Sequence, residues 1–264
     1  MARLNAAPYG ETLGSLLYPG FQHSLGTLQP TVLLAERLLH HRPHQRHRTI
    51  WRLDAGFGSD SAINWMLVRD YQLIVKGYNS RRAQKVVSQV DPAAWQVVRP
   101  NKWVALVPDG LRYARRTQTL ALRWLTESQQ ERCALLIHTL LDDEPLQVIA
   151  CYDQRGGAME VDSIKQDKFG LRLTQRRKHI WQAQEAWIIL TDLAHNLLTW
   201  LHDWMLSDSS FEHYGNLRLV QDVLSIPGQV VFNGDKLQKV ALQRSHPFAR
   251  EMQACLTRLF QNLS

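Results

Sequence analysis

Blocks of apolar and polar positions in the N-terminal part of the chain predict a β-α-β unit. A β-branched and apolar run over 49–54 ends at Asp54, and a turn with glycines follows it. A helical pattern over 59–70 follows, and a second strand-like run covers 71–76. Open α/β sheets build their sites at the carboxyl ends of buried strands. Asp54 is therefore a candidate site residue.

A second arrangement of the same kind lies further along the chain. The strand-like run over 146–152 leads through Arg155 and two glycines into a segment with helical spacing. That segment carries Glu160, Lys165 and Lys168. Two acids on adjoining elements, with basic residues beside one of them, suggest a metal-dependent phosphoryl-transfer site.

The stretch between these two arrangements is rich in strand patterns. Two runs, 103–108 and 111–116, flank the turn pair Asp109-Gly110 and predict a hairpin. Strand-like runs continue over 120–125 and 133–140, and helical patterns elsewhere cover 31–41, 181–206 and 247–262. The fold class expected is α/β, a mixed-sheet core with a β-rich insertion and a helical C-terminal region.

Composition and charge narrow the class of partner. The chain has 264 residues, 45% of them hydrophobic, which fits a globular protein. Its net charge of +7 favours a polyanionic partner, although charge alone speaks only to non-specific association. Three cysteines without metal-ligand spacing and a start without a hydrophobic signal core suggest an intracellular protein. Charged residues interrupt the apolar pattern over 181–206, so we expect no membrane span.

The two acids suit a divalent metal, and each also has a plainer explanation. Mg²⁺ prefers hard oxygen ligands and takes one or two carboxylates, with water and phosphate completing its shell. Asp54 and Glu160 could hold such a metal beside a phosphodiester. Alternatively, Asp54 caps the following turn and Glu160 offsets the dipole of a helix N-terminus.

The histidine- and arginine-rich run over 40–48 also invites a metal-site interpretation. It lacks acids or thiols at ligand spacing. A solvated basic loop is therefore favoured over a metal site.

Several motifs, in order, resemble bacterial insertion-sequence DDE transposases of the cut-and-paste type. The run Arg52-Leu53-Asp54-Ala55-Gly56-Phe57 resembles the R-x-D-x-G-F signature around their second acid. Tyr152, Arg155, Glu160 and a following lysine resemble the tyrosine-arginine-glutamate-lysine signature around their third acid. The run over 192–198 is similar to the helix that follows in the family, as are the Ile-Pro-Gly turn and the terminal helix. The resemblance covers nearly the whole chain.

The resemblance implies an RNase H-like core that cleaves DNA at transposon ends and transfers the strands into target DNA. It implies Mg²⁺ (or Mn²⁺), double-stranded DNA as partner, a homodimer in the synaptic complex, and a cytoplasmic, nucleoid-associated location. By motif position Asp54 and Glu160 match metal ligands, while Tyr152, Arg155 and Lys168 (or Lys165) match phosphate contacts. The Arg155–Glu160 gap is one residue longer than the common pattern, so the choice of lysine stays open.

The family's first aspartate has no counterpart in this chain. Before Asp54 the only acids are Glu11 and Glu36, and neither follows a strand-like run. We therefore expect an N-terminally truncated transposase whose activity is in doubt. The expected regions are a partial core over 1–80, the insertion over 81–144, the rest of the core over 145–210, and a helical region over 211–264.

Two other function classes compete with an active transposase. One is a non-catalytic DNA-binding remnant that acts as competitor or dimer partner of intact transposase, and the other, less favoured, is a repair nuclease. In the insertion, packing is favoured over base stacking for three tryptophans: Trp95, Trp103 and Trp124. Three arginines there are equally compatible with phosphate contacts or a solvated face: Arg112, Arg115 and Arg116.

Overall fold

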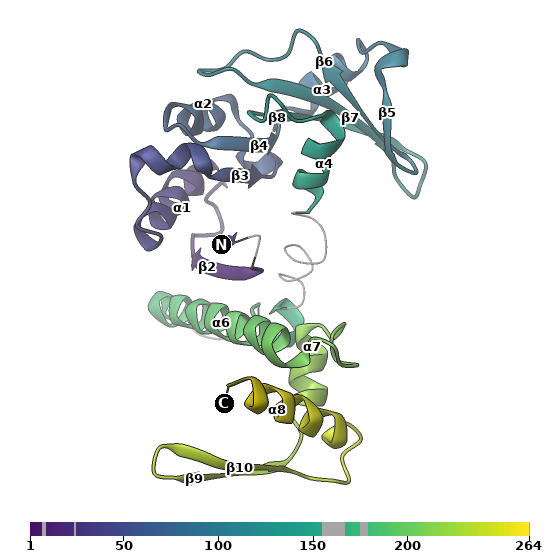
Figure 1. Cartoon of the computed structure of the whole chain (residues 1–264). Coiled ribbons are helices and arrows are strands. Elements are labelled where there is room, and N and C mark those ends of the chain that lie inside the picture. The colour runs from purple at the N-terminus through teal and green to yellow at the C-terminus, as the bar shows by residue number, and fades with distance from the viewer. Residues whose placement is uncertain (7–8, 24, 155–166, 175–178, 264) are drawn as a thin grey trace. The chain divides into compact units, whose positions relative to one another are not determined.

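The computed structural model describes residues 1–6, 9–23, 25–154, 167–174 and 179–263. Contacts divide the chain into two compact units (Figure 1). The first, here the sheet unit, consists of Met1–Ala2 and Tyr18–Gly157. The second, the helical unit, consists of Arg3–Leu17 and Ala158–Ser264.

The predicted β-α-β unit is confirmed and lies in the sheet unit. Strand β3 (Ile50–Leu53) pairs in parallel with β4 (Gln72–Lys76), and helix α2 (Asp60–Val68) connects them. The Ser59 side chain caps α2 by accepting from the backbone N–H of Ala62. Apolar side chains of both strands and of α2 join one core with the helix α1 (Leu25–Leu38), which begins earlier than the sequence pattern indicated.

A six-stranded mixed sheet in the order β3-β4-β8-β7-β6-β5 forms the centre of the sheet unit. Its other strands are β5 (Gln96–Arg99), β6 (Lys102–Val107), β7 (Gln118–Leu125) and β8 (Glu131–His138). The strands β5 to β8 pair antiparallel, and β8 also pairs antiparallel with β4. Helix α3 (Ser80–Val87) precedes them. The predicted α/β class is thereby confirmed.

The predicted hairpin over 103–116 is wrong in its second strand. β6 pairs with β7, and residues 111–116 form no strand. Their polar groups bind the α2 region instead: Ala114 N–H donates to the Asn64 side chain, and Arg115 pairs with Asp70. A strand ladder would have to break these bonds.

The predicted strand over 146–152 is also wrong, because this segment is helix α4 (Pro145–Asp153). Pro145 stands at the first helical position, where its missing N–H costs nothing. The Gln147 side chain accepts from the Glu144 N–H and so caps the helix start. Val148, Ile149 and Tyr152 then fall on one helical face, which is buried against the sheet. Apolar residues at this spacing fit a strand or a helix, and the residues that cap the segment favour the helix.

The described residues of the helical unit form two hairpins and a helical core. β1 (Ala2–Ala6) and β2 (Glu11–Leu16) form a two-stranded sheet, and β2 packs against α6 (Trp181–Leu201). The chain continues through a π-helical turn (His202–Leu206), the short α7 (Asn216–Arg218) and a second π-helical turn (Leu219–Val223). It ends in helix α8 (Ala249–Leu263), close to the predicted 247–262.

The hairpin of β9 (Gly228–Asn233) and β10 (Lys236–Leu242) was not predicted. The C-terminal region is therefore not purely helical. The turn residue Gly234 has a φ of +58°. An Asn-Gly pair such as Asn233-Gly234 is a sequence signal for a tight hairpin turn. None of the helices formed by the described residues has the length and apolarity needed to cross a membrane.

Gly58 holds the turn after Asp54 against the end of β4. A Cβ at this position would lie 1.9 Å from the carbonyl oxygen of Lys76. The Gly58 carbonyl also accepts from the Tyr78 N–H at 3.0 Å. Because both neighbours are backbone, neither can move aside cheaply.

We expect Gly58→Ala to destabilise the sheet unit by about 3 kcal/mol through overpacking. Urea unfolding followed by circular dichroism measures the change. Gly20→Ala is the matched control, because nothing lies within 4 Å of a Cβ there. Equal midpoints for the two variants would show that the turn is not tightly packed.

Candidate catalytic site

Asp54 lies at the carboxyl end of β3, as the sequence pattern predicts. It begins a short 3-10 helix (Ala55–Phe57), and its Oδ1 accepts from the Gly56 N–H at 2.9 Å. The capping role considered for Asp54 is thus present. The side chain is nevertheless exposed, so the capping bond orients a carboxylate that still faces solvent.

The end of helix α4 is bonded to the same strand end. The Arg52 guanidinium donates to the Cys151 carbonyl at 2.9 Å, and the Tyr152 hydroxyl donates to the Leu53 carbonyl at 3.3 Å. These bonds bring Tyr152, the start of the second motif, against the residue that precedes Asp54. Tyr152, about a hundred residues further along the chain, is thus held beside the strand end that carries Asp54.

Tyr152, which the resemblance implies as a phosphate contact, lies against the sheet. Its side chain is only 6% exposed, and its hydroxyl is bonded to main chain. Lys168 is exposed, in a helical turn over 167–170 of the helical unit. The other sequence-predicted site residues lie outside the described part of the chain: Arg155, Glu160 and Lys165.

The acids that precede Asp54 are held by partners within the protein. Glu36 pairs with Arg46 and Arg69 and accepts from the Tyr71 hydroxyl at 2.7 Å. Burial raises its pKa, but these bonds and the arginine charges outweigh it and hold the pKa below its usual value. Glu11 accepts from the Trp200 indole N–H at 2.6 Å.

Asp60, the acid nearest to Asp54 along the chain, also has partners within the protein. It forms a bidentate pair with Arg82, at 2.9 and 2.8 Å, and accepts from the Tyr113 hydroxyl. The hydrogen bond from Arg82 is the main reason that the pKa of Asp60 is lowered. Across the described ranges, no three histidine, cysteine, aspartate or glutamate side chains gather as a metal site.

Cationic side chains lie over the rings of the three tryptophans in the insertion. The Arg123 guanidinium lies over Trp95 at 4.3 Å and over Trp103 at 5.3 Å, and the Lys76 ammonium lies over Trp124 at 5.0 Å. Each of these contacts stabilises packing within the sheet unit. They agree with the packing interpretation of the three rings.

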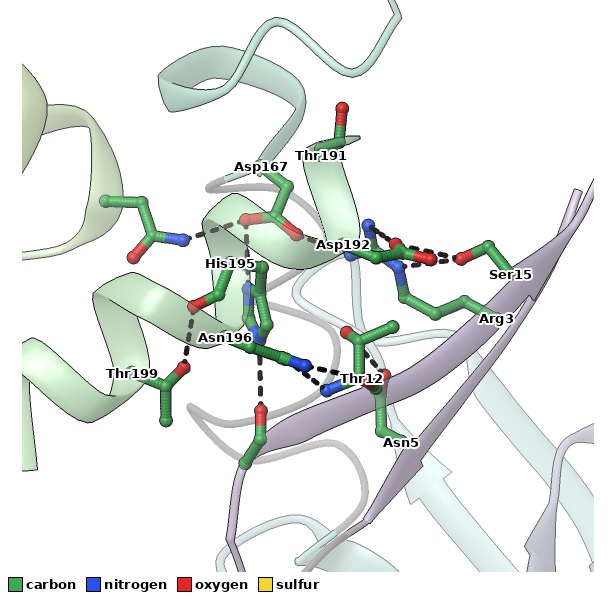
Figure 2. A network of polar contacts seen from close by, with 12 residues as sticks. Arg3, Asn5, Thr12, Ser15, Asp167, Thr191, Asp192, His195, Asn196 and Thr199 are labelled. Carbon is green, nitrogen blue, oxygen red and sulfur yellow. Dashed lines mark hydrogen bonds and ion pairs between the residues drawn. The ribbon is translucent and has the colours of Figure 1, made fainter. Parts of the chain in front are cut away.

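A buried polar network, which sequence reasoning did not find, lies in the helical unit (Figure 2). Arg3 from β1 forms ion pairs with Asp167 and with Asp192 of α6, the latter at 2.7 Å. The Ser15 hydroxyl donates to the same Asp192 oxygen, and His195 Nδ1 lies 3.1 Å from Asp167 Oδ1. Asp167 is fully buried, and the other charged groups are nearly so.

Both ring nitrogens of His195 face acceptors, which favours the charged form of the ring. Nδ1 meets the Asp167 carboxylate, and Nε2 meets the Gly10 carbonyl at 3.0 Å. A ring between two acceptors satisfies both only as the imidazolium. Burial lowers its pKa, but the hydrogen bond and charge of Asp167 outweigh burial and raise the pKa of His195. Two cations, Arg3 and His195, then balance the two aspartates.

The two carboxyl groups of the network differ in their titration. Burial raises the pKa of Asp192, against the charge of Arg3 and the Ser15 bond, and its Oδ2 is buried without a hydrogen-bond partner. Burial also raises the pKa of Asp167, but His195 and Arg3 outweigh it and hold that pKa below its usual value.

Asn196 completes the attachment of α6 to β2. Its amide oxygen accepts from the Thr12 N–H at 2.8 Å, and its amide nitrogen donates to the Thr12 carbonyl at 2.9 Å. The Asn196 amide thus makes the two backbone hydrogen bonds to β2 that a neighbouring strand would make. A polar stripe on an otherwise apolar helix was the signal for this face: Asp192, His195, Asn196 and Thr199.

Comparison with known families agrees with the motifs. The model of the family described as "Transposase DDE domain group 1" matches residues 10–264. A search of curated proteins finds no match.

Protonation of His195 is expected to make stability depend on pH. Its raised pKa means that this stabilisation is complete below the usual histidine pKa and is lost as pH rises through the raised value. Asp192, with its raised pKa, acts in the same direction at lower pH, whereas Asp167 loses stabilisation only as strong acid protonates it. Thermal unfolding should show a maximum in mild acid and a decline toward alkaline pH.

His195→Gln should remove the alkaline decline and lower stability by about 3 kcal/mol, because it leaves a buried carboxylate short of its partner. His44→Gln, a change at an exposed side chain, is the control and should retain the wild-type profile. An unchanged profile in His195→Gln would contradict the imidazolium assignment.

Proposed function

Because the chain belongs to the DDE transposase family, we propose that it is a metal-dependent transposase that cleaves DNA at the ends of a mobile element and joins them to target DNA. The proposal rests on one observation above the others. The bonds of Arg52 and Tyr152 hold the end of α4 against the strand end that presents Asp54. This contact supports the proposal because Tyr152, where the second motif begins, lies beside the strand end of the first motif.

The donor set suits Mg²⁺ or Mn²⁺. Asp54 offers an exposed carboxylate at a strand end, and Glu160 would supply the second carboxylate, both hard oxygen ligands. When bound, the metal would activate the attacking oxygen and stabilise the leaving one. The part of this chain in that chemistry is to orient Asp54, through the Gly56 N–H, and to carry Glu160 on the segment that follows α4.

The basic residues supply the DNA contacts in this proposal. Arg155 and one of Lys165 and Lys168 would neutralise the phosphate, and the net charge of +7 favours double-stranded DNA at element ends and target. Tyr152 acts as a positioning residue, since its hydroxyl binds Leu53. A homodimer in the synaptic complex, a nucleoid-associated location and the division at 80, 144 and 210 belong to the same proposal.

The second candidate is a non-catalytic DNA-binding protein that competes with an intact transposase. One observation favours it. Among the described residues, Asp54 belongs to no group of three or more histidine, cysteine, aspartate or glutamate side chains.

Asp54→Asn separates the two candidates. We expect the variant to bind duplexes that cover both flanks of its coding region, while Mg²⁺- or Mn²⁺-dependent cleavage falls to background, because metal ligands act as a unit. Asp91→Asn is a matched control, since Asp91 is also exposed and accepts from the N–H two residues on, that of Ala93. Binding by the wild type without cleavage in either metal would favour the non-catalytic candidate.

Tyr152→Phe and Lys168→Ala distinguish a positioning residue from a phosphate contact. Tyr152→Phe should lower stability by about 1 kcal/mol, through loss of one hydrogen bond, and leave the salt dependence of DNA binding unchanged. Lys168→Ala should leave stability unchanged and reduce the salt slope by about one unit. Fluorescence anisotropy across salt concentrations, with melting curves, measures both. A reduced slope in Tyr152→Phe would return that residue to the phosphate-contacting set.

A further inference from the structure

An open cleft lies between the end of helix α3 and the sheet, within the sheet unit. Its volume is about 420 Å³, within the range of small-molecule pockets in proteins. The last turn of α3 lines it, as does the segment that leads through a 3-10 turn (Pro92–Ala94) toward β5. Asp54 is not among its lining residues, so the cleft is separate from the candidate catalytic site.

The walls of the cleft combine an apolar surface with a few polar groups. Val87, Val90 and Trp95 line it, and each also packs against the core of the sheet unit. Pockets that bind small molecules have this composition, in which apolar walls supply contact area and polar groups fix orientation. The polar groups come from the end of α3 and from the sheet: Gln84, Ser88, Arg123 and Glu131.

Arg123 is the cation of the cleft, and the protein holds it in place without pairing it. On β7 it lies between Trp103 of β6 and Cys133 of β8 in the strand ladder. The rings of Trp95 and Trp103 flank its guanidinium. Among the described residues it forms no ion pair, and its Nε is shielded from solvent without a hydrogen-bond partner. Because a shielded donor without an acceptor is costly, a bound acceptor would stabilise this site.

Neither acidic group beside Arg123 supplies the missing negative charge. Burial, together with the charge of Glu131, raises the pKa of the Cys133 thiol, so the thiol stays neutral. Glu131 is exposed and forms no ion pair with Arg123. The described residues of the cleft thus leave a fixed guanidinium without a counter-charge.

We propose that this cleft, the α3 cleft, binds a small organic carboxylate with an apolar body. A carboxylate accepts two parallel hydrogen bonds from a guanidinium, and the apolar body would be buried against Val87, Val90 and Trp95.

A single negative charge suits the α3 cleft better than a polyanion does. Arg123 is the only cation among the described residues that line it, and Glu131 repels further negative charge. Binding of a DNA backbone draws instead on several lysines and arginines. The proposal therefore concerns a small molecule and does not depend on the metal site at Asp54.

Isothermal titration calorimetry of the full chain with benzoate as probe tests the ligand class. Benzoate should bind, while benzyl alcohol, which has the ring without the carboxylate, should bind about tenfold more weakly or less, because the charge-assisted hydrogen bonds are lost. Inorganic phosphate should also be weaker than benzoate. Absence of benzoate binding, or equal binding of benzyl alcohol, would overturn the proposal. Tighter binding of phosphate would assign Arg123 to a phosphate group and overturn the carboxylate assignment.

Substitutions test the place of binding. Arg123→Gln should raise the Kd for benzoate about tenfold or more. Arg99→Gln is the matched control, since Arg99 is exposed on β5 and does not line the cleft, and it should keep the wild-type Kd. An unchanged Kd in Arg123→Gln, or an equal loss in Arg99→Gln, would overturn the assignment of the site.

Glu131→Gln keeps the test decisive if Arg123→Gln unfolds the sheet unit. Removal of this exposed like charge should lower the Kd about twofold, and a higher Kd would contradict the proposal. Asp54→Asn should bind benzoate as the wild type does, so failure of the cleavage proposal and failure of the cleft proposal are separately visible.

Discussion

The burial of charge at Arg3 is the constraint on which the helical unit depends. One guanidinium, 2% exposed, pairs with two carboxylates that would each be costly to bury alone. Loss of one partner from such a pair usually costs about 3–5 kcal/mol, because the remaining charge stays buried and unpaired. The network joins the N-terminal hairpin to α6 and to Asp167, so three distant stretches of sequence are held by the same few atoms.

The network also bears on the proposed chemistry through its place in the sequence. Asp167 follows Glu160 by seven residues, and Tyr152 precedes Glu160 by eight. The chain is therefore anchored before the glutamate by the Leu53 carbonyl and after it by Arg3. Each anchor lies within its own unit.

The sequence predicted best what short-range patterns control. The parallel β3–β4 pair and the position of Asp54 followed from apolar runs and a glycine turn, and both are confirmed. Helix α4 was mistaken for a strand because its apolar positions suit either element, and Pro145 with Glu144 settles the matter locally. Arg3 and Asp167 could not be paired from sequence, since their contact spans 164 positions and neither residue belongs to a motif.

The buried polar face of α6 determines which of its residues lie on the outward face. Apolar packing alone would let an apolar helix rotate about its axis, because one leucine can replace another at modest cost. The hydrogen bonds of Asp192, His195 and Asn196 permit only one rotation, since each donor must meet its own acceptor. That rotation places Leu193 and Leu197 outward. Polar groups buried at a cost in desolvation thus determine which apolar face of the helix lies outward.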